Sequence, residues 1–472
     1  MPRCDCHTPP GLSRRPVRYA VRGEAATVGQ GTPMLSLPPW RKIAAGLWNR
    51  LPLPFERMAA RIDDPGQTDA PVDGPPLNKI CDRRDWAHPA WQKALSDLGY
   101  SDDPARLHRK EWEFAQGVYG LRTLRCLSPD AAALGLGAGA EPIIYFLAGR
   151  LRRVVATDLY AGDFSGQEAD PRILRDPEAF APFSYHRDRL EVRRMDATTI
   201  DYGPESFDLV FSFSSFEHFG SRRAQRKCLG EIHRVLRPGG VAVLTTEVIL
   251  NTWGRHGDYF RLTELLDDMI PAAGFQLAGG NFQFATSRAT LAALIQLPHE
   301  IERRPHLILR RWRTYFTSAA FFLEKPVAPG TPEARCAVRG DEVPVGLPPL
   351  LRARLAAPPA YVTVPRSTIY RITCRIENTG HATWPRSSPD GFGLVRLGAH
   401  LVPSDGAPMI LDYGRAELPR DLAPGTSAEV GLELLAPDRP GRYRVELDMV
   451  REGVAWFSSR EPSSVEVPLT VT

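Results

Sequence analysis

Short, almost uninterrupted apolar runs alternate with helix-length segments between residues 131 and 324. Runs such as 131–136 and 207–213 have the length of buried strands, and 141–149 reads as the helix that follows the first. Apolar strands separated by helices indicate a mostly parallel sheet covered on both faces. We therefore expect an α/β fold over this part of the chain.

Beyond residue 349 the pattern changes to short strands in which apolar and polar residues alternate. Turn signals at 378–380, 424–425 and 440–441 separate these strands. Alternation of this kind predicts an all-β sandwich of about seven strands. The clearest alternating apolar positions are Ile372, Cys374, Ile376, Val430, Leu432, Leu434, Tyr443, Val445, Leu447 and Met449.

Residues 1–76 are predicted to have little regular structure, except at 39–51. Residues 1–33 and 61–76 are rich in Pro and Gly, which interrupt helices and strands. A basic amphipathic helix at 39–51 either lies on a membrane surface or packs on its own protein, and both interpretations stay open. Its apolar face consists of Trp40, Ile43, Ala44, Leu47, Trp48 and Leu51.

The pattern divides the rest of the chain into three regions. An α/β domain is expected over 77–325, with a helical lead-in at 77–128. A linker rich in Pro and Gly follows at 326–348, and the sandwich occupies 349–472.

Composition excludes several classes of protein. Hydrophobic content of 43% and charged content of 24% are ordinary for a globular protein, and no apolar run reaches the ~18 residues of a membrane span. The net charge is only +4 and the arginines are scattered, so no nucleic-acid groove is expected. Seven widely spaced cysteines argue against a disulfide framework and for the cytoplasm. Cys4 and Cys6 have no second pair of matching spacing, so no metal is predicted.

A glycine-rich turn follows the first strand of the α/β region. Gly135, Gly137 and Gly139 lie between that strand and its helix, where glycine allows a ligand to approach the backbone. The same turn also fits a dinucleotide fingerprint and is a weak signal alone. Asp158 ends the second strand, 23 residues after Gly135, and Leu159 follows it. An acid at this place binds the two ribose hydroxyls of a nucleoside cofactor.

Three later segments separate the alternatives. Asp196 and Ala197 follow a third strand, where an acid suits the amino group of adenine. The fourth strand runs into a polar and aromatic loop that includes Ser212 and Ser214. Residues 236–240 form a sharp turn into a fifth strand.

In this order, the segments resemble a class I S-adenosylmethionine-dependent methyltransferase over about residues 105–324. The resemblance implies a Rossmann-like sheet of seven strands with helices on both faces, and S-adenosyl-L-methionine as cofactor. It departs from the family at Ala133, where an acid is usual, and Glu141 is the candidate substitute. A dinucleotide enzyme and a non-catalytic relative remain alternatives. The cofactor-binding residues that it implies are Gly135, Gly137, Gly139, Glu141, Asp158, Leu159, Asp196, Ala197, Ser212 and Ser214.

Methyl transfer to a hydroxyl needs a base beside the cofactor. Glu217 and His218 follow the fourth strand, and Glu247 ends the fifth, so all three face the ligand edge of the sheet. His256 lies in the polar and aromatic loop 251–259 and is a second base candidate, because histidine titrates near neutrality. Glu217 and His218 serve either this chemistry or only the packing of the next helix.

The region 109–113 and residues 245–247 also resemble bacterial methyltransferases of cell-surface polysaccharide synthesis. Residues 349–472 resemble the immunoglobulin-like domains attached to such enzymes, through segments that include Trp384 and Trp456. We expect O-methylation of an envelope saccharide or related small molecule, in the cytoplasm or at the inner face of the membrane through 39–51. A lipid or quinone acceptor and a non-catalytic glycan-binding protein are the alternatives. The sandwich would bind a glycan or a protein partner, or its tryptophans serve packing alone.

Overall fold

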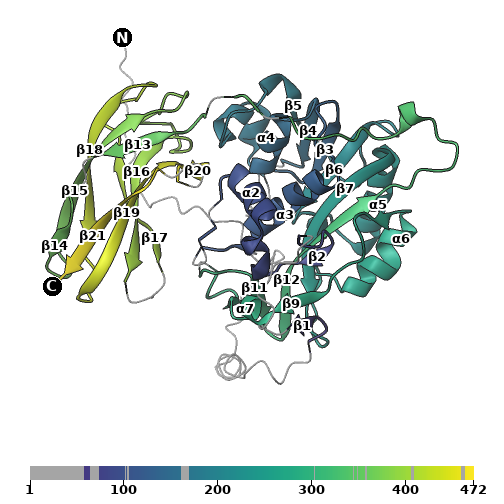
Figure 1. Ribbon diagram of the computed structural model, residues 1–472, viewed down its shortest axis with the longest axis horizontal. Coiled ribbons are helices and arrows are strands. Elements are labelled where there is room, and N and C mark those ends of the chain that lie inside the picture. The colour runs from purple at the N-terminus through teal and green to yellow at the C-terminus, as the bar shows by residue number, and fades with distance from the viewer. Residues whose placement is uncertain are drawn as a thin grey trace, which may run out of the picture.

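The computed structural model describes residues 58–63, 74–100, 102–103, 106–160, 169–301, 303–343, 345–347, 349–356, 359–404, 409–458 and 463–472. The predicted helix at 39–51 lies outside these residues. An α/β part and an all-β part lie side by side (Figure 1). Among the described helices, none has the length and hydrophobicity needed to cross a bilayer.

The α/β part contains a sheet of ten described strands, with the order β10–β11–β12–β7–β6–β3–β4–β5. Strands β3 to β7 run parallel, and β12 is antiparallel to β7. A path of seven strands, β8–β12–β7–β6–β3–β4–β5, matches the predicted sheet, and β2, β10 and β11 extend it. The strands are β2 (Lys79–Ile80), β3 (Ala132–Leu136), β4 (Arg153–Asp158), β5 (Leu190–Arg194), β6 (Phe207–Phe213), β7 (Leu236–Ile249), β8 (Gln276–Leu277), β10 (Leu294–Gln296), β11 (Ile308–Arg311) and β12 (Thr314–Glu324). A separate pair consists of β1 (Arg61–Asp63) and β9 (Ala285–Ser287).

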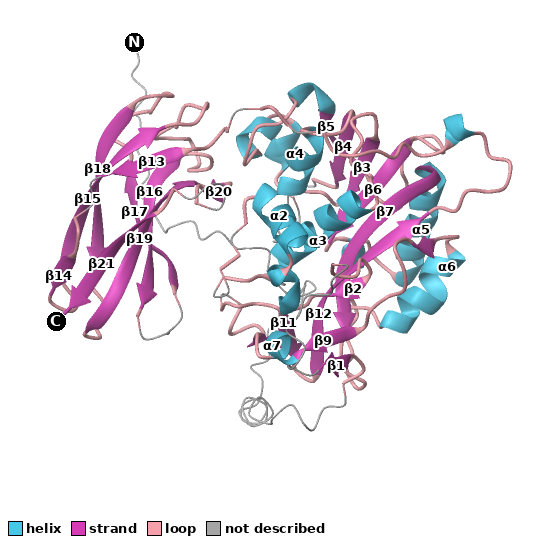
Figure 2. Ribbon diagram, viewed as in Figure 1, coloured by secondary structure: helices cyan, strands magenta, loops and turns pink. Residues whose placement is uncertain are grey.

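Helices cover both faces of this sheet, as predicted (Figure 2). Alternate residues of β3 enter different cores: Ala133 packs with α2, α3 and α4, whereas Leu134 packs with α5, η7 and α6. This division follows from the strand period of two. The predicted turn at 236–240 is the start of β7, with φ 74° at Gly239. The helices are α2 (Pro89–Asp97), α3 (Arg109–Thr123), α4 (Pro142–Ala148), α5 (Arg222–Val235), the π-helix η7 (Glu264–Met269), α6 (Ile270–Ala272) and α7 (Arg288–Leu291).

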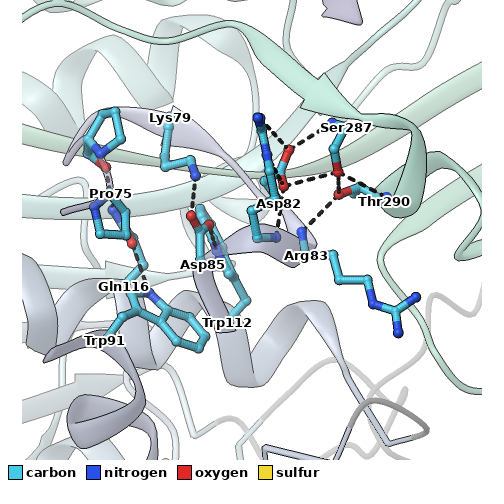
Figure 3. A network of polar contacts seen from close by, with 12 residues as sticks. Pro75, Lys79, Asp82, Arg83, Asp85, Trp91, Trp112, Gln116, Ser287 and Thr290 are labelled. Atoms are coloured by element: carbon cyan, nitrogen blue, oxygen red, sulfur yellow. Dashed lines mark hydrogen bonds and ion pairs between the residues drawn. The ribbon is translucent and has the colours of Figure 1, made fainter. Parts of the chain in front are cut away.

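A buried polar network fastens the lead-in to α3 (Figure 3). Lys79 forms an ion pair with Asp85, and the indole nitrogen of Trp112 donates to the same carboxylate at 2.7 Å. Asp82 accepts from the backbone N–H of Ser287 at 2.8 Å, which ties the lead-in to the start of α7. Burial raises the pKa of Asp85, and Lys79 opposes that shift. The network therefore depends on Lys79 for its counter-charge.

The segment after β12 lies along the α/β part. Glu342 accepts from Arg122 at 2.6 Å and forms an ion pair with Arg150, and the backbone N–H of Gly340 donates to the carbonyl of Arg125 at 2.8 Å. The described part of the predicted linker is therefore bonded to the domain that precedes it.

The C-terminal part consists of two sheets packed across one core. Ile372, Cys374 and Ile376 are fully buried in it, as their alternation predicted. Trp384 is also fully buried, whereas Trp456 is half-buried against His400, with ring centroids 4.1 Å apart. The described sandwich has more than the about seven strands predicted, since β14 and β20 are too short to show a period. One sheet holds β13 (Ala353–Ala356), β15 (Ile369–Asn378) and β18 (Ser427–Leu435), and the other holds β14 (Val362–Val364), β16 (Val395–Pro403), β17 (Ile410–Glu417), β19 (Gly441–Arg451), β20 (Ala455–Trp456) and β21 (Val465–Val471).

The sandwich contacts the segment that connects β4 to β5. Phe392 packs on Phe180 with ring centroids 4.5 Å apart, and the Arg172 guanidinium lies 4.4 Å from the centre of the Phe392 ring. Arg172 also forms an ion pair with Asp390, and Arg451 donates to the carbonyl of Ala181 at 3.3 Å. Apolar, cationic and hydrogen-bonded contacts thus join the two parts here, and an ion pair between Arg106 and Glu446 joins them as well.

Candidate functional site

The glycine turn is packed against the end of β6. A Cβ on Gly135 would lie 2.5 Å from the Phe211 ring, and one on Gly137 would lie 2.5 Å from the Cβ of Ser215. Gly137 and Gly139 have φ values of 61° and 51°, which L side chains rarely adopt. Ser215 donates to the carbonyl of Gly137 at 2.8 Å, so the turn is held in place by the fourth strand. The predicted requirement for glycine therefore has two physical causes, close packing and backbone conformation.

Asp158 lies beside the turn at the end of β4, as predicted. Its carboxylate accepts from the backbone N–H of Gly139 at 3.2 Å and from that of Leu159 at 2.7 Å. The hydroxyl of Tyr160 donates to the carbonyl of Gly139 at 3.0 Å. Leu159 is 52% exposed, so its side chain is available to a ligand at this edge. These bonds fix the orientation of the Asp158 carboxylate beside the turn.

The other predicted cofactor residues differ in their surroundings. Asp196 is exposed after β5 and accepts from the backbone N–H of Thr198 at 2.8 Å, while Ala197 is buried. Ser212 is fully buried within β6. The hydroxyl of Ser214 donates to Glu113 at 2.6 Å, so it joins a polar cluster described below.

The departure from the family at Ala133 is visible in the sheet. Ala133 is fully buried and aligns with Val154 and Leu209 on the neighbouring strands. Glu141 stands at the N-cap of α4 and is half-buried. The position of the usual acid is thus part of the apolar core, and the carboxylate that is bonded to the turn is that of Asp158.

A cluster of buried carboxyl groups lies at the ends of β6 and β7. Arg109 Nη1 lies 2.7 Å from Glu247 Oε1 and 3.2 Å from Glu113 Oε1. Thr246 donates to Glu217 Oε2 at 2.8 Å. Arg109 and the three glutamates are each at most 5% exposed, and the Arg109 guanidinium pairs directly with two of the three carboxyl groups. The sequence did not assign Arg109 and Glu113 to the site, although the region 109–113 contributes to the family resemblance.

The cluster holds its carboxyl groups in different protonation states. Burial and the neighbouring Glu247 raise the pKa of Glu217 well above its usual range. Burial would also raise the pKa of Glu247, but the charge of Arg109 and the hydrogen bond with Glu217 outweigh it and hold that pKa well below its usual range. The cluster therefore favours the protonated form of Glu217 and the ionised form of Glu247.

The two predicted histidines lie near this anion. His218 is exposed at the end of the 3-10 helix η6 (Phe216–His218), and its charge acts on Glu247. His256 stacks on Tyr259 with ring centroids 3.8 Å apart, and it interacts electrostatically with both Glu247 and His218. Burial lowers the pKa of His256 more than Asp258 raises it. Electrostatic interactions thus link the four residues that the sequence singles out as catalytic candidates, and their catalytic role stays a prediction.

Comparison with known proteins covers part of the chain. Residues 134–244 match the sequence model of a family described as a methyltransferase domain. The match supports a class I S-adenosylmethionine-dependent methyltransferase. Its cofactor is S-adenosyl-L-methionine, and the glycine turn with the oriented carboxylate of Asp158 fits the nucleoside part of that cofactor. No curated protein matches the chain.

Several solved structures are similar at low identity. The cyclase SpnF is 16% identical, with 50% of this chain and 93% of that chain covered and a TM-score of 0.32. An S-adenosylmethionine-dependent methyltransferase from Mesorhizobium loti is 17% identical, with 43% and 95% covered and a TM-score of 0.28. One from Aquifex aeolicus is 14% identical, with 42% and 84% covered and a TM-score of 0.26. Matches at these values identify neither a substrate nor an activity.

Carboxyl and imidazole groups of this kind are also the usual ligands of metal ions. Within the described residues, no group of three or more His, Cys, Asp or Glu side chains is arranged to hold a metal ion. The carboxyl groups of the cluster are occupied by Arg109, by Thr246 and by each other.

Proposed function

We propose that the chain is an O-methyltransferase that transfers a methyl group from S-adenosylmethionine to a hydroxyl of a cell-envelope saccharide. The observation that carries this proposal is the buried carboxyl group of Glu247, which lies 2.7 Å from Arg109 and interacts electrostatically with His218. A hydroxyl acceptor must lose a proton as it attacks, whereas an acceptor with a free lone pair and no proton to lose needs no base. A histidine beside a fixed carboxylate supplies such a base.

Bound S-adenosylmethionine supplies a methyl group on a positively charged sulfur. The chain binds the ribose through Asp158 and places the acceptor oxygen at the ends of β6 and β7. His218 accepts the hydroxyl proton while the new oxygen–carbon bond forms and the carbon–sulfur electron pair returns to sulfur. Glu247 stabilises the resulting imidazolium, because its charge is already fixed in a site of low dielectric constant. The carboxylic acid of Glu217 keeps its proton and orients Glu247.

The saccharide class is supported by the acceptor loop and by the family resemblance. Loop 251–259 presents exposed Thr252 and Asp258 and half-buried His256, which suits an acceptor with several hydroxyls. The resemblance of 109–113 and 245–247 to enzymes of cell-surface polysaccharide synthesis also supports a saccharide acceptor. The resemblance of the sandwich to the immunoglobulin-like domains of such enzymes supports the same acceptor. The described residues of loop 251–259 include no aliphatic side chain of the kind that a quinone pocket needs.

An acceptor screen with the full chain tests the proposal. The protein is incubated with S-adenosylmethionine and, separately, with envelope saccharides, a reduced quinone and small amines, and methylated products are identified by mass spectrometry. Methylation of a saccharide hydroxyl, lost in Asp158→Ala and slowed in His218→Ala, supports the proposal. Methylation of only the quinol or the amine would overturn it.

A further inference from the structure

Two tryptophans are exposed next to the acceptor side of the domain. Trp253 is 63% exposed in the loop after β7, and Trp312 is 67% exposed in the turn between β11 and β12. Large exposed aromatic side chains mark interaction surfaces when they gather in one place. Trp253 and Trp312 belong to one such surface if their two loops are joined.

Hydrogen bonds connect the two loops into one unit. The side chain of Asn251 donates to the carbonyl of Arg313 at 2.8 Å, and the backbone N–H of Arg255 donates to Thr314 Oγ1 at 2.9 Å. Arg311 also lies 3.3 Å from the imidazole of His256. We call residues 251–256 and 311–314 the tryptophan lobe. It lies at the end of the domain where β11, β9 and β1 gather (Figure 1).

Within the described residues, neither indole belongs to a buried core. The small core beneath the lobe, around Tyr259 and Phe316, contains neither Trp253 nor Trp312. Trp312 has φ 57° in a two-residue turn, a conformation for which glycine is the favourable residue. A bulky residue in this conformation costs free energy and gains no packing in return. The indole at this tip therefore points to a contact outside the described chain.

The lobe is also basic. Arg255 and Arg313 are exposed and Arg311 is half-buried. An exposed acidic residue, Asp258, lies next to the lobe in the sequence. Indole rings that stand next to guanidinium groups match the interface of a bilayer, where rings enter the headgroup region and cations meet phosphates. An apolar protein partner would instead call for a patch with few charges at its centre.

The chain that precedes the described residues leaves from this same lobe. Met58 forms a β-bridge with Asn251, and the backbone N–H of Ala59 donates to the carbonyl of Leu250 at 2.7 Å. The segment 39–51, whose pattern predicts a basic amphipathic helix with Trp40 and Trp48, ends seven residues before Met58 in the sequence.

We propose that the tryptophan lobe docks on an anionic membrane surface. Trp253 and Trp312 insert at the headgroup level, and Arg255 and Arg313 contact lipid phosphates. This docking brings His256 and the acceptor side of the site to the bilayer. The proposal does not rest on the identity of the acceptor, since membrane binding is measured without turnover.

Vesicle flotation of the full chain tests this docking. We expect the protein to float with vesicles of phosphatidylglycerol and phosphatidylcholine, and not with phosphatidylcholine alone. Trp253→Ser with Trp312→Ser should lower the partition coefficient about tenfold or more, because two interfacial indoles are lost. Tyr361→Ser, which removes a 73% exposed ring on the sandwich, is the matched control and should change nothing.

Further variants separate the contributions. Arg255→Ser with Arg313→Ser should weaken binding and reduce its dependence on salt. The effect of the Trp253 and Trp312 changes should persist when Trp40→Ser and Trp48→Ser are also present. Calorimetric binding of S-adenosylhomocysteine verifies that each variant is folded. Flotation that is equal for wild type and the Trp253 and Trp312 variant, or a loss only of self-association in light scattering, would overturn the proposal.

Discussion

Replacing Arg109 by methionine tests whether the buried carboxyl cluster depends on one cation. Its guanidinium lies 2.7 Å from Glu247 and 3.2 Å from Glu113, and both carboxyl groups are at most 3% exposed. Methionine keeps an unbranched apolar side chain but removes the charge, so both groups lose their main partner; Lys110, 3.7 Å from Glu113, compensates in part. We expect the free energy of unfolding to fall by about 3–5 kcal/mol, as is typical when one partner of a buried ion pair is removed.

The same substitution should reverse the pH dependence contributed by Glu247. In the wild type its folded-state pKa is depressed, so its contribution to stability is present above the unfolded pKa of about 4.3 and is lost as the pH falls through the folded pKa. Without Arg109, burial raises the folded-state pKa above the unfolded one. The native variant then binds more protons than the unfolded chain between these values, and its stability falls as the pH rises through that window.

Urea unfolding at about pH 5 and about pH 8 measures both effects. Arg109→Met should be more destabilised relative to wild type at the higher pH. Adding Glu247→Gln should recover part of the loss, since one uncompensated charge disappears. A loss below about 1 kcal/mol, the value of an exposed ion pair, would refute the argument. So would a deficit that is equal at the two pH values.

Three further changes test other parts of the site and fold. Asp158→Ala should raise the dissociation constant of S-adenosylhomocysteine at least about 100-fold in calorimetry, because the ribose loses two hydrogen bonds of about 1.5–3 kcal/mol each; an unchanged constant would remove Asp158 from the site. His218→Ala should lower kcat about 100-fold or more with cofactor affinity nearly unchanged, and wild-type turnover would make His218 structural. Lys79→Met should destabilise the fold by about 3–5 kcal/mol in urea unfolding, because it leaves Asp85 buried without its counter-charge. Lys93→Met removes an exposed ion pair and should cost less than about 1 kcal/mol. Equal effects of the two lysine changes would contradict the importance of burial.

The parallel sheet could be predicted because its signals are local. Strands such as β3 and β6 are buried apolar runs, and the predicted cofactor acid Asp158 is the last residue of another largely apolar strand. Strands β2 and β8 have two residues each and β10 has three, so no period marks them. They exist because neighbouring backbone offers hydrogen bonds, which depends on tertiary structure.

Half of the carboxyl cluster could not be found in the same way. Arg109 and Glu113 come from α3, more than 100 residues before Glu247 in the chain, and their roles depend on burial and distance. The spacing of four between them places both on one helical face, which also describes many exposed ion pairs. Only the structure shows that this face is covered.

The contact of the sandwich with the segment between β4 and β5 has a consequence for dividing the protein. That segment joins the strand that carries Asp158 to the strand that precedes Asp196. Removal of residues 349–472 would expose Phe180 to water and leave the connection between the two cofactor acids unsupported. The α/β part therefore cannot be produced alone without a compensating change, and a shortened version for engineering needs a polar residue in place of Phe180. During evolution, residues on the two sides of this contact are expected to vary together.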